Sequence, residues 1–410
     1  MKSVFIIIFF ALFISCKQEA PITTDQIKKD VAYLADDKLE GRYTGSEGEL
    51  KAAQYIADRF KALELKPKGN NGTYFQKFDF SPKTNPHQIP DSTANPPGKI
   101  TGTNVLGYID NHAKTTVVIG AHYDHLGYGG MGSLYREGKA IHNGADDNAS
   151  GVAAIMDLAL KLKDKNTANN YLFIAFSGEE LGLLGSNYFV KNAIIPLEEV
   201  NYMINLDMVG RLKEEKTLVI NGTGTSPVWK STLTDMNVEN YFNIVMKESG
   251  VGPSDHTSFY LNDIPVLHFF TGQHDNYHKP SDDTNTLNYE GITAISDYVF
   301  RLISALDNKG KLTFAKTKDE SEKAPEFKVT LGVVPDYMYE GKGMRIDGVT
   351  EDKPAHNAGL KKGDIVIKMN DYEITDMMGY MTALSKFEAG QTIKVTVKRG
   401  EKDLIMDLTF

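Results

Sequence analysis

The sequence predicts an α/β protein: a mixed, largely parallel sheet with helices on both faces, followed by a small, mostly β domain. The first observation is that short apolar runs alternate with segments whose apolar residues recur at helical spacing. The second is that several runs are apolar throughout, as in strands covered on both faces. The third is a change beyond residue 326 to short alternating strands punctuated by glycine, which indicates a separate β domain.

The elements of the first domain can be placed in order. Residues 24–65 carry apolar side chains at helical spacing, interrupted at 41–46, and residues 74–80 form a strand candidate. The strands expected in the sheet are 104–109, 116–120, 171–176, 202–206 and 264–270. The helices expected between and after them are 152–162, 184–191 and 290–306.

The domain boundaries follow from a change of composition. Residues 308–325 are charged and poor in large apolar side chains, which is typical of a linker. We therefore expect a first domain over 24–307 and a second over 326–410. The strands expected in the second domain are 329–334, 344–349, 364–369 and 392–398, with a helix near 379–387.

The overall composition excludes some classes of function. The chain has 410 residues, of which 41% are hydrophobic and 24% charged, as in ordinary soluble proteins with room for two domains. Its formal net charge is −9 and no basic cluster is present, so nucleic acid is not an expected partner. A single cysteine rules out an intramolecular disulfide.

That cysteine follows an apolar run near the N-terminus. Lys2 precedes the run at 4–14, and Ser15 and Cys16 follow it. A short basic start, a short apolar core and a small residue are typical of an export signal, and the run is too short to span a membrane comfortably. Residues 1–16 resemble a bacterial lipoprotein signal, although Phe13 stands where leucine is usual. We expect a protein exported from a bacterial cytoplasm and held in the periplasm or cell envelope through lipidated Cys16; the alternative is an ordinary cleaved signal with an incidental cysteine.

Histidines and carboxylates follow the predicted strand ends. His122, Glu179 with Glu180, and Asp207 each lie one to four residues beyond a strand, Asp147 precedes a helix, and His278 follows the last strand. Each has an ordinary explanation: a loop histidine, an N-cap aspartate, or acids in the first turn of a helix. Ligands of parallel sheets gather beyond the carboxyl ends of the strands. We therefore expect these side chains to converge on one edge.

Such a set of side chains is suited to metal catalysis. Mixed imidazole and carboxylate ligands favour zinc, and a carboxylate can bridge two ions. Paired metals activate a water molecule and polarise a carbonyl, while an unligated carboxylate can move the proton. Spacing alone does not tell which of Glu179 and Glu180 is the base. Asp124, two residues after His122, is placed to orient that imidazole.

These residues resemble a known family. The motifs are His122-Tyr123-Asp124, Asp146-Asp147-Asn148, Gly178-Glu179-Glu180, Asn205-Leu206-Asp207 and Tyr277-His278. Together they are similar to the dizinc exopeptidases of the aminopeptidase S, aminopeptidase Y and glutamate carboxypeptidase type, over about residues 34–306.

The resemblance implies a role for each position. His122 and Asp207 would bind one Zn²⁺, Glu180 and His278 the other, and Asp147 would bridge the two. Glu179 would be the general acid and base, and Tyr277 matches a position that some relatives use to stabilise an oxyanion. We interpret three neighbours as supporting or structural residues and not as ligands: His125, Asp146 and His256.

The second domain has its own resemblance. Leu331-Gly332-Val333, Ala358-Gly359-Leu360 and Lys398-Arg399-Gly400 look like parts of a bacterial PDZ domain. Such domains add a peptide strand to a sheet edge and hold its terminal carboxylate on N–H groups, here those near Leu331, Gly332 and Val333. The alternative is a PDZ fold used only for packing or dimerisation.

Three functions therefore remain open from the sequence. The leading one is a secreted or lipid-anchored aminopeptidase with two zinc ions, acting on peptides or proteins, with a C-terminal peptide as a further ligand of the PDZ domain. The second is a single-zinc glutaminyl cyclase, since cyclases share this fold. The third is a non-catalytic protein that binds peptides through its PDZ domain.

Overall fold

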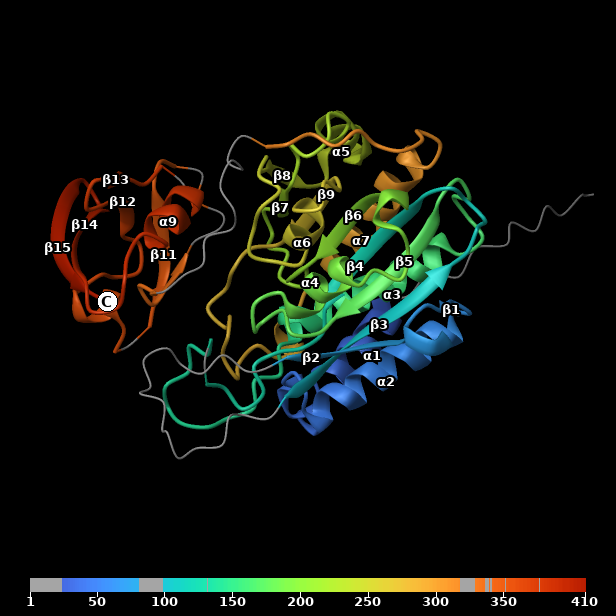
Figure 1. The fold of residues 1–410 in the computed structure, drawn as a ribbon, viewed down its shortest axis with the longest axis horizontal. Helices are drawn as coiled ribbons and strands as arrows, with labels where there is room; N and C mark the ends of the chain where they lie inside the picture. Colours follow the sequence, from blue (N-terminus) through green and yellow to red (C-terminus); the bar gives the residue numbers. More distant parts are fainter. Residues whose placement is uncertain are drawn as a thin grey trace, which may run out of the picture.

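We describe a computed structural model of the chain. It describes residues 24–80, 99–130, 132–317, 329–335, 339, 341–350, 352–375 and 377–410. The signal at 1–16, including Cys16, and the later part of the expected linker lie outside these residues. The described chain forms two units, each with its own sheet and its own buried core, and Figure 1 shows the second in orange to red.

The first unit is a nine-stranded sheet with strand order β1-β3-β5-β4-β6-β9-β7-β8, and β2 also pairs with β3. Four neighbouring pairs are parallel: β5 with β4, β4 with β6, β6 with β9, and β7 with β8. The remaining pairs are antiparallel. The strands are β1 (Lys66–Pro67), β2 (Phe75–Phe80), β3 (Ile100–Ile109), β4 (Thr116–His122), β5 (Asn170–Phe176), β6 (Val200–Leu206), β7 (Thr217–Asn221), β8 (Asn243–Met246) and β9 (Val266–Phe270). The predicted mixed, largely parallel sheet is therefore confirmed.

Helices cover both faces of this sheet (Figure 1). In β4 the side chains of Val117 and Ile119 join one buried cluster, while Val118 between them joins the cluster on the opposite face. Helices α1, α3 and α7 pack together on the first face, and α4 and α6 pack on the second. The helices are α1 (Thr24–Leu34), α2 (Glu47–Ala62), α3 (Gly151–Leu162), α4 (Leu184–Lys191), α5 (Trp229–Met236), α6 (His256–Tyr260) and α7 (Tyr289–Leu306). Among the described residues, no helix is both long enough and apolar enough to cross a membrane.

The second unit is a small antiparallel sheet. Its strands run in the order β10-β11-β12-β14-β15, with β13 paired to β12. The elements are β10 (Val333–Pro335), β11 (Met344–Val349), α8 (Pro354–Asn357), β12 (Ile365–Met369), β13 (Tyr372–Glu373), α9 (Met377–Leu384), β14 (Thr392–Arg399) and β15 (Lys402–Thr409). The expected separate, mostly β domain is confirmed.

Some elements were not predicted from the sequence pattern. The pattern does not indicate β7, β8, α5 or α6 in the first unit, nor β15 in the second. The side chains of β8 are exposed or half-buried and those of β15 are mostly exposed, so neither strand forms a buried apolar run. The chain beyond α7 also packs more closely than a charged linker would, because Leu312 is buried in the core of the first unit.

Candidate metal centre

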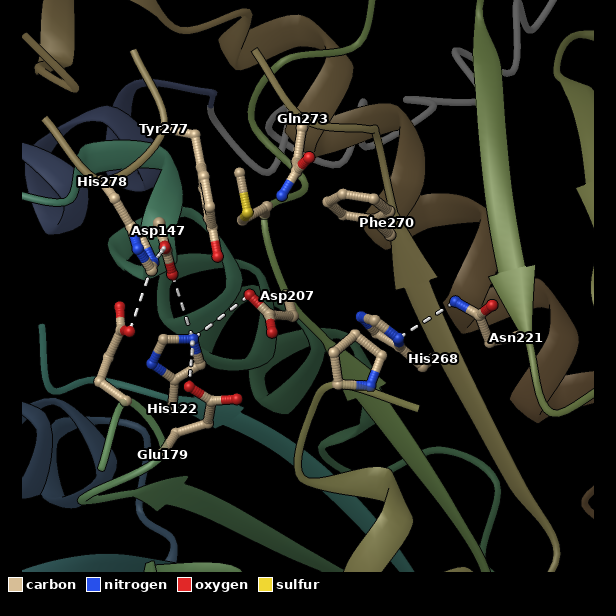
Figure 2. A pocket seen from close by; sticks show the side chains of 13 residues that line it. His122, Asp147, Glu179, Asp207, Asn221, His268, Phe270, Gln273, Tyr277 and His278 are labelled. Atoms are coloured by element: carbon tan, nitrogen blue, oxygen red, sulfur yellow. Dashed lines mark hydrogen bonds and ion pairs between the residues drawn. The ribbon is translucent and has the colours of Figure 1, made fainter. Parts of the chain in front are cut away.

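The sheet brings the expected ligands together at one edge. His122 is the last residue of β4, Glu179 and Glu180 follow β5 by three and four residues, and Asp207 directly follows β6. Asp147 lies in the turn Ala145–Ser150 before α3, and His278 lies beyond β9. Figure 2 shows these side chains converging on one cavity.

The first cluster is centred on the His122 imidazole. Its Nε2 atom lies 3.3 Å from Asp147 Oδ1 and 3.3 Å from Asp207 Oδ1. All three side chains are buried. Burial alone would lower the pKa of His122, but the carboxylates of Asp207, Glu179 and Asp147 raise it well above its ordinary value.

The second cluster uses the other oxygen of Asp147. His278 Nε2 lies 3.2 Å from Asp147 Oδ2 and 3.3 Å from Glu180 Oε2. The two oxygens of one carboxylate thus face two different histidines, which is the arrangement of a bridging ligand.

The donor set fits zinc. A tetrahedral zinc site with bonds of about 2.0–2.1 Å places its ligand atoms roughly 3.3 Å apart. The four separations above match this value. In addition, the Nδ1 atom of His122 lies 3.2 Å from the main-chain oxygen of Asp124, and that of His278 lies 2.8 Å from the main-chain oxygen of Gly132. An Nδ1–H donated to a carbonyl leaves the Nε2 lone pair of each ring free for a metal.

His125 also reaches the second cluster. Its Nδ1 lies 2.8 Å from Glu180 Oε1 and 3.9 Å from Asp147 Oδ2. The shorter distance is that of a hydrogen bond, too short for two ligands of one zinc ion. His125 therefore fits a role as a supporting residue that holds Glu180, while His278 fits the ligand position.

Glu179 stands beside the clusters without joining them. Its Oε2 lies 3.9 Å from His122 Nε2, farther than the ligand separations. Burial raises the pKa of Glu179 well above its usual value, and the nearby Asp207 and Glu180 carboxylates raise it further, against the effect of His122. A carboxylate in this position can take or give a proton next to the ligands.

Asp124 joins two of the ligand segments through main-chain hydrogen bonds. Its carboxylate accepts the N–H of Glu179 at 3.1 Å and that of Glu180 at 3.4 Å. The same carboxylate lies 3.8 Å from His122 Nδ1, beyond hydrogen-bond distance, so it is the main-chain oxygen of Asp124 that faces the imidazole.

Sequence reasoning missed Asp282. Its carboxylate accepts the N–H of Asp146 at 3.0 Å and that of Asp147 at 3.0 Å, and so fixes the main chain of the bridging residue. Burial raises the pKa of Asp282 to about 6. The one available signal was that Asp282 lies four residues after His278. Acidic residues are common in loops, so this position alone did not indicate a role.

Asn148 ties the Asp147 turn to the segment that carries Asp207. Its Nδ2 donates to the Leu206 oxygen at 3.0 Å, and its Oδ1 accepts the N–H of Met208 at 3.1 Å. The residues on either side of Asp207 are thus fixed to the neighbour of Asp147.

The cavity extends from the two clusters toward β7 and β9. Besides the ligands and Glu179, its lining includes Met208, Asn221, Pro253, His268, Phe270, Gln273 and Tyr277. The Tyr277 ring is stacked on His278 with 3.8 Å between ring centroids, and its hydroxyl end points into the cavity (Figure 2). The space beside the clusters is thus open to a ligand.

Comparisons with known proteins agree with this fold. Residues 104–303 match the model of peptidase family M28. The chain contains a peptidase family M28 domain. The aminopeptidase YwaD of Bacillus subtilis is 30% identical over 195 residues, which cover 45% of this chain and 42% of the relative. This chain spans between 42% and 62% of the full length of four matching relatives, YwaD included.

Solved structures share the fold of this M28 domain. A zinc aminopeptidase from Bacillus subtilis aligns with a TM-score of 0.55 and 19% identity, covering 74% of this chain and 98% of that one. The glutaminyl cyclase of Porphyromonas gingivalis aligns with a TM-score of 0.54 and 18% identity, covering 69% and 98%. At these identities the likeness shows the fold alone.

Residues 315–409 match the PDZ domain model, which confirms the second resemblance. In the expected carboxylate-binding segment, Leu331 is buried and Gly332 has a left-handed φ of 72°. The Gly332 N–H donates to Thr330 Oγ1 at 3.1 Å. A bound carboxylate would compete with that hydroxyl for this donor.

Proposed function

We propose that this chain is an exported, zinc-dependent aminopeptidase that removes N-terminal residues from peptides. One observation carries the proposal: two ligand clusters share the oxygens of Asp147, and an unligated acid, Glu179, lies beside them. The M28 match and the named activities of the relatives support the same reaction.

Each residue of the centre has a role in this proposal. His122 and Asp207 would hold one zinc ion, Glu180 and His278 the other, and Asp147 both. When bound, the paired ions supply Lewis acidity toward a peptide carbonyl and lower the pKa of water. Glu179 accepts the proton of the attacking water and returns it to the leaving amine. Tyr277 points its hydroxyl into the cavity, where it can donate to the developing oxyanion.

The proposal includes a place in the cell and a role for the second domain. Lipid on Cys16 would attach the exported protein to the cell envelope, with the PDZ domain recruiting peptide C-termini. The apolar run before Cys16 and the PDZ match support these two parts.

A glutaminyl cyclase is the second candidate, favoured by the fold shared with the Porphyromonas gingivalis enzyme. That function requires a single zinc ion, whereas here the two histidines face separate oxygens of Asp147. The complete second cluster therefore favours the aminopeptidase.

One experiment separates the candidates. Purified protein is analysed for zinc and incubated with peptides that begin with leucine, glutamine or an N-acetylated residue. We expect two zinc ions per chain, release of the first residue from free-amine peptides, and no reaction with the acetylated peptide. One zinc ion, together with loss of ammonia from the glutamine peptide, would establish the cyclase instead.

A further inference from the structure

Arg42 is a fully buried arginine whose recorded hydrogen-bond acceptors are all main-chain carbonyls. Its Nε donates to the Tyr123 oxygen at 2.6 Å, and its Nη2 donates to the Gly144 oxygen at 3.0 Å. Its Nη1 donates to the Asn143 oxygen at 2.6 Å and also to the Leu34 oxygen. Burial lowers the pKa of Arg42 to about 10, so the guanidinium stays charged at neutral pH.

These acceptors lie next to the metal ligands in the chain. Tyr123 stands between His122 and Asp124, and Gly144 precedes Asp147 by three residues. A planar guanidinium with fixed donor directions can hold both segments at a set separation. Because a buried charge without its hydrogen-bond partners is costly, the two segments cannot move apart freely.

Thr44 and Glu49, from the same part of the chain, also reach the segment of Tyr123 and Asp124, and Glu49 reaches a further ligand segment at Ser177. Thr44 Oγ1 donates to Asp124 Oδ2 at 3.1 Å. Glu49 Oε1 accepts the Tyr123 hydroxyl at 3.1 Å and also the Ser177 hydroxyl, just before Gly178-Glu179-Glu180. Burial raises the pKa of Glu49 to about 7.

The main chain here is also packed too closely for a larger residue. Gly41 has a φ of +70°, and a Cβ on it would lie 2.5 Å from the His142 oxygen and 2.6 Å from the Gly127 oxygen. Its own carbonyl accepts the Gly127 N–H at 3.0 Å. Gly41 therefore packs tightly against the loops that carry Gly127 and His142, next to the contacts that Arg42, Thr44 and Glu49 make with the ligand segments.

We propose that Arg42, Thr44 and Glu49, here called the N-terminal clamp, position the metal ligands and set the affinity of the centre for zinc. The clamp lies outside the part of the chain that matches the M28 model, residues 104–303. It acts through Tyr123, Asp124, Gly144 and Ser177 and touches no reacting atom. The inference rests on the zinc centre proposed above.

The test compares zinc affinity with stability in the full chain. Thr44→Val removes the hydroxyl donor to Asp124, and Thr44→Ser keeps it. Thr293→Val is the matched control, because Thr293 Oγ1 donates within α7 to the Tyr289 oxygen. Arg59→Lys is the control for Arg42→Lys. The Nε of Arg59 donates to Asp30 Oδ1 at 2.8 Å, away from the ligand segments. Zinc affinity is measured by competition with a chromophoric chelator, and the unfolding midpoint is measured on zinc-free protein.

Loss of an outer hydrogen-bond partner typically weakens metal binding about 10–100-fold. We expect this weakening in Thr44→Val and Arg42→Lys, and near-normal affinity in Thr44→Ser. The two controls, Thr293→Val and Arg59→Lys, should keep wild-type zinc affinity at unfolding midpoints comparable to those of the clamp variants. Unchanged affinity in folded Thr44→Val, or equal weakening in Thr44→Ser or Thr293→Val, would overturn the clamp. Should Arg42→Lys not fold, the threonine series decides alone. An unaltered chain that binds no zinc would refute the metal centre itself.

Discussion

Replacing Glu179 by glutamine separates proton transfer from metal binding. The substitution keeps the size of the side chain and removes its ability to take a proton. General acid–base assistance is typically worth about 10²–10⁴-fold in rate, or roughly 2.7–5.4 kcal/mol of activation free energy. Since Glu179 Oε2 lies 3.9 Å from His122 Nε2, outside the ligand separations of 3.2–3.3 Å, zinc content should stay at the wild-type level.

Glu180→Gln is the matched control, one residue along the same segment. Glu180 Oε2 lies 3.3 Å from His278 Nε2 and its Oε1 accepts a hydrogen bond from His125, so this variant should lose zinc as well as activity. The assay measures kcat on a chromogenic aminoacyl substrate and bound zinc on the same sample. Zinc lost from Glu179→Gln but kept by Glu180→Gln would mean that the two roles are reversed. A Glu179→Gln rate within a few-fold of wild type would show that this residue is not the base.

Three further predictions concern the other parts of the chain. Asp147→Asn should lower the zinc content of both sites, because the two oxygens of Asp147 face different histidines. His278→Ala should mainly empty one site. Equal zinc losses in the two variants, measured by elemental analysis, would contradict a bridging role for Asp147. Truncation after Asp319 should leave hydrolysis of a small aminoacyl substrate within a few-fold of wild type, because the two units have separate cores; near-total loss in a folded truncation would show that the second unit completes the site. Cys16→Ser should release the protein from membranes, and mass spectrometry that finds an unmodified Cys16 in the native protein would refute lipidation.

The sequence allowed the sheet and the convergence of the ligands to be predicted for a physical reason. Strands buried on both faces are apolar runs, and the polar residues at their carboxyl ends meet at one edge because the strands are parallel. This holds for β4, which ends at His122, for β5, which Glu179 and Glu180 follow, and for β6, which Asp207 follows.

The unpredicted elements carry that signal more weakly. The buried apolar run of β7 is only three residues long, Leu218 to Ile220, and β8 lies at the sheet edge with exposed or half-buried side chains. The choice between His125 and His278 as a ligand could not come from spacing either. It depends on which nitrogen faces Asp147 and at what distance, which the loops beyond β4 and β9 determine.

Among the residues that hold the ligands in place, the sequence pattern pointed to Asp124 but to neither Arg42 nor Asp282, for a related reason. Arg42, Asp124 and Asp282 are buried charged groups that form hydrogen bonds with the main chain at or beside the ligands and not with the ligand side chains. Arg42 donates to the oxygens of residues 123 and 144. Asp124 accepts the N–H groups of residues 179 and 180, and Asp282 accepts those of residues 146 and 147. Contacts to main-chain atoms impose no residue type on the partner, so they leave no pattern in the sequence. They also make the position of each ligand segment independent of the ligand side chain. Substituting a ligand should therefore empty a metal site while the surrounding loops keep their places, whereas substituting one of these three charged groups should shift two loops at once.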